Sequence, residues 1–423
     1  MTSSKDKFRL PKKYRGFSTN IWNEITNLIN QYKPLNLGMG FPDFPPPKDV
    51  TRVLSEVATD ENFLLHQYSR QFGHLRLVNA LAKFYGMLIE RDLNPHKEIL
   101  INGTGCQALF TPIMAHVEEE DEVIIIEPYF DFYETIVKIA GGKCKFIPLR
   151  LKETNSQKNA QSSCEWSLDK KELENVFNEK TKMFILNTPN NPLGKVFNLE
   201  ELTIIADLCK KWNVLCLADE VYEFFIYSPN QHIRICTLPG MWERTITTTC
   251  PGKTFNVTGW ALGVAYGPEN LLHNLKIVEN DLPFVSTPIQ EAFAIIFEQE
   301  IKRFREKDSI LVSLPRDLEI KRDFMVKTLI EAGMKPVIPE GGFLISVNWK
   351  HIASRTGLKL EEDEAKDFQF TKWMIRNIGL AGIPVSAFYS QKNKHLGEDY
   401  IRFCFLKEIK TLQQFADITK KLN

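Results

Sequence analysis

The sequence has no excess of charge of either sign, because 53 lysines and arginines are matched by 53 aspartates and glutamates in 423 residues. A strongly basic surface is the usual footprint of a protein that binds nucleic acid or a membrane surface, and a neutral chain lacks it. No run of eighteen apolar residues occurs either, which argues against a membrane-spanning helix. We therefore expect neither nucleic acid nor a membrane among its partners. With 43% hydrophobic and 25% charged residues, the chain is typical of a globular protein of two or more domains.

The eight cysteines stand singly and form no C-x-x-C pair, which is typical of reduced thiols in a cytoplasmic protein. The eight histidines show no H-E-x-x-H pattern, so no metal site is expected. The first sixteen residues carry six basic groups and one acid, Asp6, which leaves a mitochondrial signal open. Because Pro11 interrupts this segment, we interpret it as a polar arm and expect a cytoplasmic location.

Apolar segments alternate with amphipathic segments over most of the chain. Uninterrupted apolar strands connected by helices indicate an α/β fold, with a mainly parallel sheet covered by helices on both faces. From about residue 301, long charged helices and short strands predict a smaller α+β domain. We therefore divide the chain into an N-terminal arm with part of the small domain (1–48), a large domain (49–300) and a small domain (301–423). The polar segment 152–163 is predicted to be a mobile insertion.

Lys253 stands where a reactive lysine would be expected. The β-branched run 245–249 predicts a strand, Pro251 and Gly252 end it, and a second apolar strand is predicted over 261–266. A partly desolvated lysine on a tight connector loses its proton easily and can act as a nucleophile. The alternative interpretation is an ordinary surface lysine on a loop.

Other polar and aromatic residues also follow predicted strands. In parallel sheets, ligands bind beyond the carboxyl ends of the strands, so these residues predict a site there. The residues in question are Thr104, Phe130, Asn191, Asp219, Tyr222 and Lys253. The segment Gly103-Thr104-Gly105 joins a strand to a helix and could hold a phosphate at the helix N-terminus. It does not match G-x-G-x-x-G, because position 108 is alanine, so a dinucleotide site is not supported.

Arg402 lies in the last predicted strand. Ile401, Phe403 and Phe405 would point to one face of that strand, and Arg402 to the other. An arginine in a covered strand needs an anionic partner, and a carboxylate can pair with it through two hydrogen bonds. A surface arginine is the alternative.

Several motifs resemble the fold-type I aminotransferases that use pyridoxal phosphate. These are Asn191-Pro-Leu-Gly194, Asp219-Glu-Val-Tyr222 and Gly252-Lys-Thr-Phe-x-x-Thr-Gly-Trp260. Longer phrases, such as Gly40-Phe-Pro-Asp-Phe44 and Tyr400-Ile-Arg-Phe-Cys-Phe405, are similar to the kynurenine aminotransferase group, also called glutamine transaminase K or cysteine-S-conjugate β-lyase. The resemblance extends from about Phe8 to the C-terminus.

The resemblance implies a cofactor, pyridoxal 5′-phosphate, and a role for each matching residue. Lys253 would bond covalently to the cofactor and move the substrate proton, and Asp219 would pair with the ring nitrogen. Tyr222 and Asn191 would hydrogen-bond the phenolic oxygen, and Phe130 would stack on the ring. The phosphate would lie near Thr104, Gly105, Cys106 and Cys250, and near Tyr68 of a second subunit. Arg402 would bind the substrate carboxylate, with Asn191, Gly40 and Trp22 beside it.

The implied function is transfer of the amino group of an aromatic or bulky amino acid, of the kynurenine, glutamine or phenylalanine type, to a 2-oxo acid. A β-lyase side activity and a homodimer with shared active sites are also implied. The chain departs from the family at the phosphate, where Ala261 replaces a basic residue and Cys250 replaces a serine. Cys106 and Met39 also differ from the usual tyrosine and glutamine. These departures leave a second hypothesis open, a degenerate homologue that binds pyridoxal phosphate weakly and acts as a non-catalytic dimeric binding protein.

Overall fold

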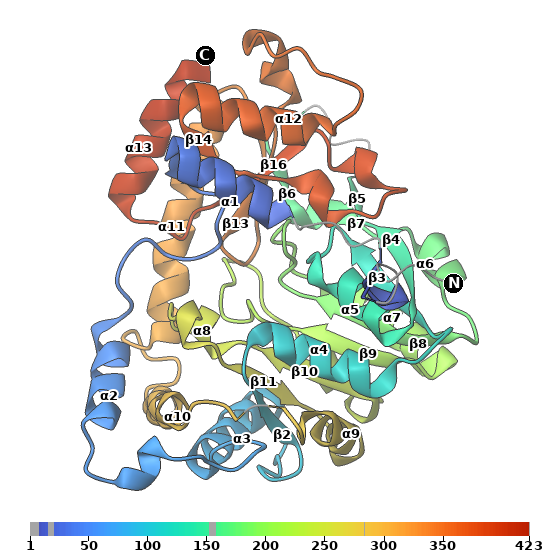
Figure 1. Ribbon diagram of the computed structural model, residues 1–423, viewed down its shortest axis with the longest axis vertical. Helices are drawn as coiled ribbons and strands as arrows, with labels where there is room; N and C mark the ends of the chain where they lie inside the picture. The colour runs from blue at the N-terminus through green and yellow to red at the C-terminus, as the bar shows by residue number, and fades with distance from the viewer. Residues whose placement is uncertain (1–7, 16–20, 152–157, 283, 423) are drawn as a thin grey trace.

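The structure is a computed structural model that describes residues 8–15, 21–151, 158–282 and 284–422. Its centre is a seven-stranded sheet, which occupies the lower part of the molecule in Figure 1. In order across the sheet the strands are β2 (Ile99–Asn102), β11 (Gly263–Tyr266), β10 (Thr245–Thr249), β9 (Leu215–Asp219), β8 (Thr181–Asn187), β3 (Glu122–Glu127) and β4 (Lys143–Pro148). Only β11 runs antiparallel to its neighbours, so the predicted mainly parallel sheet is confirmed.

Alternation of side chains along the strands builds two helix-covered faces, because successive residues of a strand point to opposite sides. On β3, Val123 and Ile125 pack on one face, whereas Ile124 and Ile126 pack on the other. The first face is covered by α4 (Gly105–His116), α5 (Phe132–Ala140) and α9 (Glu269–Glu279). The second is covered by α3 (Leu75–Ile89), α6 (Lys170–Val176), α7 (Leu199–Trp212) and α10 (Thr287–Lys302), with α2 (Lys48–Ala58) against α10.

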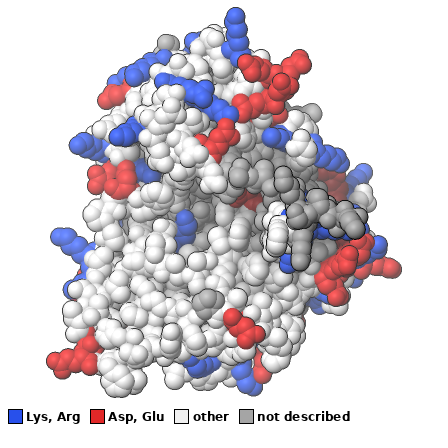
Figure 2. Space-filling view, viewed as in Figure 1, with Lys and Arg blue, Asp and Glu red and all other residues white. Residues whose placement is uncertain are grey.

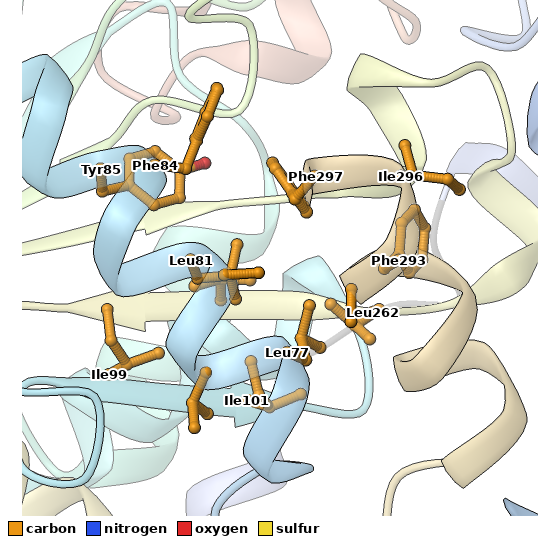
Figure 3. Close-up of a cluster of buried hydrophobic side chains, with 14 of the residues drawn as sticks. Leu77, Leu81, Phe84, Tyr85, Ile99, Ile101, Leu262, Phe293, Ile296 and Phe297 are labelled. Atoms are coloured by element: carbon orange, nitrogen blue, oxygen red, sulfur yellow. The ribbon is translucent and has the colours of Figure 1, made fainter. Parts of the chain in front are cut away.

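Figure 3 shows the second face in detail. Leu77 and Leu81 of α3 lie over Ile99 and Ile101 of β2, and Phe293 of α10 lies beside Leu262 in the same cluster. These side chains are almost fully buried. Burying such side chains contributes about 1.5–3 kcal/mol each, so this layer holds the helices firmly on the sheet.

A second sheet of five strands occupies the upper part of the molecule in Figure 1. Its strands are β15 (Ile383–Pro384), β16 (Tyr400–Cys404), β13 (Leu344–Asn348), β12 (Lys335–Ile338) and β6 (Gln161–Ser162). The helices around it are α1 (Ile21–Tyr32), α11 (Ile310–Glu331), α12 (Lys366–Trp373) and α13 (Ile409–Thr419). The short strand β1 (Leu35–Asn36) pairs with β14 (Leu380–Ala381), which joins the N-terminal segment to this part of the chain. A separate antiparallel pair is formed by β5 (Arg150–Leu151) and β7 (Trp166–Ser167).

The prediction of a mobile insertion over 152–163 is wrong at its C-terminal end. Gln161 and Ser162 form β6, which pairs in parallel with β12. Ser163 is fully buried, and its hydroxyl donates to the carbonyl of Gly194 at 3.2 Å. The local composition is polar, but pairing with a strand far along the chain overrides it. Residues 152–157 lie outside the described part of the chain. No helix among the described residues is both long and apolar enough to cross a bilayer.

Candidate active site

The carboxyl ends of β8, β9 and β10 open onto a cavity of about 380 Å³ that reaches across to the second sheet. Its lining contains predicted site residues from both halves of the chain. These are Gly40, Thr104, Gly105, Cys106, Phe130, Asn191, Asp219, Tyr222, Cys250, Lys253 and Arg402. The cavity therefore brings together residues that are hundreds of positions apart in the sequence.

Lys253 stands on α8 (Pro251–Thr254), a single helical turn at the place of the predicted tight connector. Pro251 fits the first helical position, because its missing N–H would be unpaired there anyway. The Lys253 ammonium nitrogen donates to the carbonyl of Gly40 at 3.0 Å. Burial lowers the pKa of Lys253, which favours the neutral amine that a nucleophile requires.

Asp219 ends β9 and is 4% exposed. One of its carboxylate oxygens accepts the hydroxyl of Tyr133, and the other accepts the backbone N–H of Val221 at 3.2 Å. Burial raises the pKa of Asp219 to about 6, although both hydrogen bonds favour the charged form. A buried carboxylate of this kind is suited to a cationic partner within the cavity.

Arg402 lies on β16, and its neighbours Ile401 and Phe403 point into the core of the second sheet as predicted. The Arg402 guanidinium donates to the side-chain oxygen of Asn191 at 2.9 Å, and its central carbon lies 4.7 Å from the ring centroid of Phe388. Burial lowers the pKa of Arg402 below its ordinary value. A guanidinium aimed into an apolar cavity is a strong site for a carboxylate.

Aromatic rings border the centre of the cavity. Tyr222 is buried, and its ring meets that of Phe343 edge-on with centroids 4.8 Å apart. Burial raises the pKa of Tyr222, so its hydroxyl stays protonated and can donate a hydrogen bond. Phe130 packs edge-on against Tyr133 at 5.8 Å, and its ring borders the cavity.

The glycine loop 103–105 leads into α4 at one end of the cavity. Thr104 caps this helix, since its side-chain oxygen accepts the backbone N–H of Gln107 at 2.9 Å. A Cβ on Gly105 would lie 3.2 Å from the sulfur of Cys250, so the two segments approach closely. The Cys250 thiol donates to the carbonyl of Leu262 at 3.3 Å, and burial raises its pKa. Ala261 has a left-handed backbone with φ of 47°, which is why β11 begins at Gly263 rather than at the predicted residue 261.

Two predicted site residues do not lie in this lining. Tyr68 is 84% exposed, and the centroid of its ring lies 4.9 Å from that of Phe284, with the two rings tilted. Trp22 belongs to α1, but its side chain lies outside the described part of the structure.

Sequence reasoning missed several residues of the cavity. Val221, Thr248 and Thr249 line it, and their positions beside Asp219 and at the end of a predicted strand could have revealed them. Phe41 lies in an aromatic loop next to the predicted Gly40. Leu344 comes from the second sheet, and no local pattern indicates that it faces the cavity.

Comparison with known proteins decides the family. The family model for aminotransferases of class I and II matches residues 32–418. The chain belongs to this family. It is 45% identical over 415 residues to kynurenine–oxoglutarate transaminase 3 of Homo sapiens, with 98% of this chain and 90% of the relative covered. It is 44% identical over 404 residues to kynurenine–oxoglutarate transaminase 1 of Mus musculus, with 95% of each covered.

The fold agrees with this assignment. The crystal structure of Bna3p from Saccharomyces cerevisiae matches with a TM-score of 0.91 and 26% identity, covering 98% of this chain and 99% of the other. The predicted family, the α/β fold and the classification as an aminotransferase enzyme are confirmed. The boundaries proposed for three domains and the individual roles of the site residues stay predictions.

Proposed function

We propose that this aminotransferase uses pyridoxal 5′-phosphate to move the amino group of an aromatic or bulky amino acid to a 2-oxo acid. The observation that carries the proposal is that Lys253, Asp219 and Arg402 line one cavity. An amine, a buried guanidinium and a buried carboxylate are the groups that this reaction needs.

The donor set fits the cofactor. Burial raises the pKa of Asp219, and a protonated ring nitrogen beside it would offset the cost of burying its negative charge. Lys253 has a lowered pKa suited to covalent attachment, and Gly105 allows a close approach to the start of α4. When bound, pyridoxal phosphate supplies a ring that accepts electrons from the substrate α-carbon.

Each residue of the chain then has a physical task. Asp219 keeps a proton on the ring nitrogen, and Tyr133 and the Val221 N–H hold Asp219 in place. Lys253 removes and returns the proton at the substrate α-carbon. Tyr222 and Asn191 donate to the phenolic oxygen of the ring, and Phe130 packs on its face.

The residues that would hold the phosphate are Thr104, Gly105 and Cys106 at the start of α4, with Cys250 close to Gly105. Backbone N–H groups at a helix N-terminus favour an anion. Tyr68 of a second subunit adds a hydroxyl.

Apolar side chains around Arg402 favour a bulky substrate. Phe41, Leu344 and Tyr222 line the cavity, and they suit a kynurenine, glutamine or phenylalanine side chain. The relatives named as kynurenine–oxoglutarate transaminases support the same donor and acceptor classes. Gly40 and Trp22 complete the substrate pocket. A good leaving group on the β-carbon would depart after loss of the α-proton, so we also propose β-lyase activity on cysteine S-conjugates.

We further propose a homodimer in the cytoplasm. Large apolar residues are exposed near Tyr68, namely Phe63, Leu64, Leu75 and Phe284. Figure 2 shows few charged side chains in the lower half of its view, where Figure 1 places α3, α4 and α10. Exposed apolar surface of this kind favours a protein interface. All eight cysteines are free thiols, which suits a reducing compartment.

Spectroscopy of the purified protein tests the proposal. Wild-type protein incubated with pyridoxal phosphate should be yellow, and borohydride should remove the absorbance and fix the cofactor to Lys253. Lys253→Ala should fold normally but lose about a hundredfold or more of its amino-transfer rate, because a general acid–base is lost. A Lys253→Ala protein with turnover within a few-fold of wild type would contradict the assignment of Lys253.

A further inference from the structure

We propose that Glu279 is a positioning residue that fixes the glycine loop 103–105 so that the loop can receive the phosphate of the cofactor. The proposal rests on the proposed function, because it assumes that pyridoxal phosphate occupies the cavity. Glu279 is the last residue of α9 and does not line the cavity among the described residues. It acts through Gln107.

Glu279 joins the two sides of the glycine loop. Its carboxylate accepts the side-chain amide of Asn102 at 2.5 Å, the hydroxyl of Thr111, and the side-chain amide of Gln107 at 2.8 Å. Asn102 ends β2 immediately before the loop, whereas Gln107 and Thr111 lie in the first two turns of α4. The carboxylate is 4% exposed, so each of these bonds is shielded from water.

The carboxylate also fixes which way the Gln107 amide points. An ionised carboxylate only accepts hydrogen bonds, so the NH₂ of Gln107 must face Glu279. The amide oxygen of Gln107 then faces the loop, where it accepts the backbone N–H of Gly103 at 3.1 Å. That oxygen lies 2.7 Å from the position of a Cβ on Gly103, so any side chain at position 103 would displace the Gln107 amide.

Neighbouring segments leave the loop little freedom to compensate. A Cβ on Gly263 of β11 would lie 2.2 Å from the carbonyl oxygen of Thr104. On the other side of the network, the Gln71 amide donates to the carbonyl of Glu279 at 2.9 Å and to that of Leu282 at 2.8 Å. The Gln71 amide thus fixes the backbone of Glu279, while the Glu279 carboxylate fixes the residues on either side of the glycine loop.

Because the cavity has no basic side chain at positions 250 and 261, binding of a phosphate depends more strongly on the position of the glycine loop 103–105. Ala261 and Cys250 line the end of the cavity near Gly105, and neither side chain carries a positive charge there. An anion at this end depends on the backbone N–H groups at the start of α4, whose directions are set by the loop. Backbone N–H groups bind an anion less tightly when the residues that fix their directions become free to move.

Binding of two ligands that differ only in the phosphate tests this role. Dissociation constants of the cofactor-free protein for pyridoxal 5′-phosphate and for pyridoxal would be measured from the absorbance of the lysine adduct. Glu279→Gln should weaken pyridoxal phosphate about tenfold or more, because a misplaced hydrogen bond to a charged group costs roughly 1.4 kcal/mol or more. Pyridoxal affinity should change less than about twofold, since pyridoxal makes no phosphate contact.

Glu300→Gln is the matched control. Glu300 is also a fully buried carboxylate; it accepts hydrogen bonds from Arg303 and Ser309 at the end of α10 and is not part of the cavity lining. The Glu300→Gln variant should lose about as much stability as Glu279→Gln. It should keep the wild-type ratio of the affinities for pyridoxal phosphate and pyridoxal. If Glu279→Gln does not fold, Gln107→Leu removes the connecting amide and should give the same phosphate-specific loss.

The outcomes separate this inference from the proposed function. Wild-type protein that fails to bind pyridoxal phosphate would overturn the proposed function, and this inference with it. Wild-type protein that prefers pyridoxal phosphate, with Glu279→Gln and Gln107→Leu variants that keep the same preference, would overturn the inference alone. An equal loss of both affinities would assign Glu279 a general structural role and also contradict the proposal.

Discussion

At the scale of single residues, the side chains of the turn 219–223 point in two directions, some toward the cavity and some into the protein interior. Asp219 and Tyr222 line the cavity, whereas Glu220 and Glu223 are buried behind them. Glu220 contacts His232 at 2.9 Å, and Glu223 pairs with Arg234. Glu223 also accepts the hydroxyl of Thr249 at 2.8 Å, which ties this turn to the strand that leads to Lys253. The buried charges behind the cavity thus hold together the two segments that carry Asp219 and Lys253.

Burial of Asp219 predicts that the free energy of unfolding of the cofactor-free protein depends on pH. Its folded pKa is raised to about 6, so the stability it contributes is present at low pH and is lost as the pH rises through about 6. Asp219→Asn stays neutral at every pH. The variant should therefore gain stability over wild type by about 2 kcal/mol between about pH 4.5 and about pH 7. Chemical denaturation at both pH values checks this, and a constant difference would contradict it.

Ala261 predicts weak retention of the cofactor. A phosphate dianion without a basic side chain loses a charged hydrogen bond, so Ala261→Lys should tighten binding about tenfold to a hundredfold. Ala261→Met is the control, because it has a long side chain and the same left-handed backbone without the charge. The rate of cofactor loss during dialysis against an amino donor gives the readout. Equal rates for wild type and Ala261→Lys would mean that another group supplies the missing charge.

At the scale of elements, the carbonyls of the loop 38–41 accept hydrogen bonds from three basic side chains, one on α8 and two at or just after β16. The Gly38 carbonyl accepts Arg402 at 3.4 Å, and the Gly40 carbonyl accepts Lys253 at 3.0 Å. Lys407 donates to the carbonyls of Met39 at 3.4 Å and Phe41 at 2.7 Å. In the proposed function Lys253 would bind the cofactor and Arg402 the substrate, which would leave Lys407 as the basic side chain that holds the loop.

This arrangement predicts that Lys407→Met raises KM for the amino acid about tenfold and changes kcat much less. Lys407 is 2% exposed, and its loss removes the 2.7 Å hydrogen bond to the carbonyl of Phe41, whereas the carbonyl of Met39 keeps the backbone N–H of Phe41. The loop would then position Phe41 poorly over the substrate. Lys410→Met is the control, because Lys410 is exposed on α13. Steady-state kinetics with an aromatic donor measures the effect. A fall in kcat at unchanged KM would contradict this role for the loop.

The sequence was sufficient to predict the cavity residues whose positions depend on a nearby strand, either at its end or by alternation along it. Asp219 and Asn191 lie just after apolar strands, and alternation along one strand placed Arg402 opposite the core. Tyr133, Lys407 and Glu279 could not be found in this way, because their roles depend on partners 86 to 368 positions away. The same reason explains β6, whose polar residues become a strand only beside β12.

At the scale of the whole molecule, the cavity lies where the two sheets meet. Lys253 and Asp219 come from the seven-stranded sheet and its connections, and Arg402 and Leu344 come from the five-stranded sheet. Any change in the relation of the sheets therefore changes the distance between the reactive amine and the carboxylate-binding guanidinium. The proposed division at residue 301 places these two functions in different domains, although β6 shows that residues 161–162 pair with the smaller sheet.

The position of Tyr68 predicts that a second copy of the chain completes each site. Its ring is exposed and lies outside the cavity of its own chain, in a region where other large apolar residues are also exposed. Tyr68→Ala and Lys253→Ala should each be nearly inactive alone at low cofactor concentration. In a hybrid dimer, one site receives Lys253 from the first variant and Tyr68 from the second, so that site is intact.

Equal mixing with random exchange makes about half of the dimers hybrids, each with one working site, so activity should recover to about a quarter of wild type. Light scattering or differential tagging would first verify dimers and subunit exchange. A mixture of Tyr68→Ala with a double variant carrying both changes is the control, because no site in it can contain both residues. Recovery in the first mixture and none in the control requires sites shared between subunits. Exchange without recovery would mean that each site takes Lys253 and Tyr68 from the same chain, which would contradict shared sites.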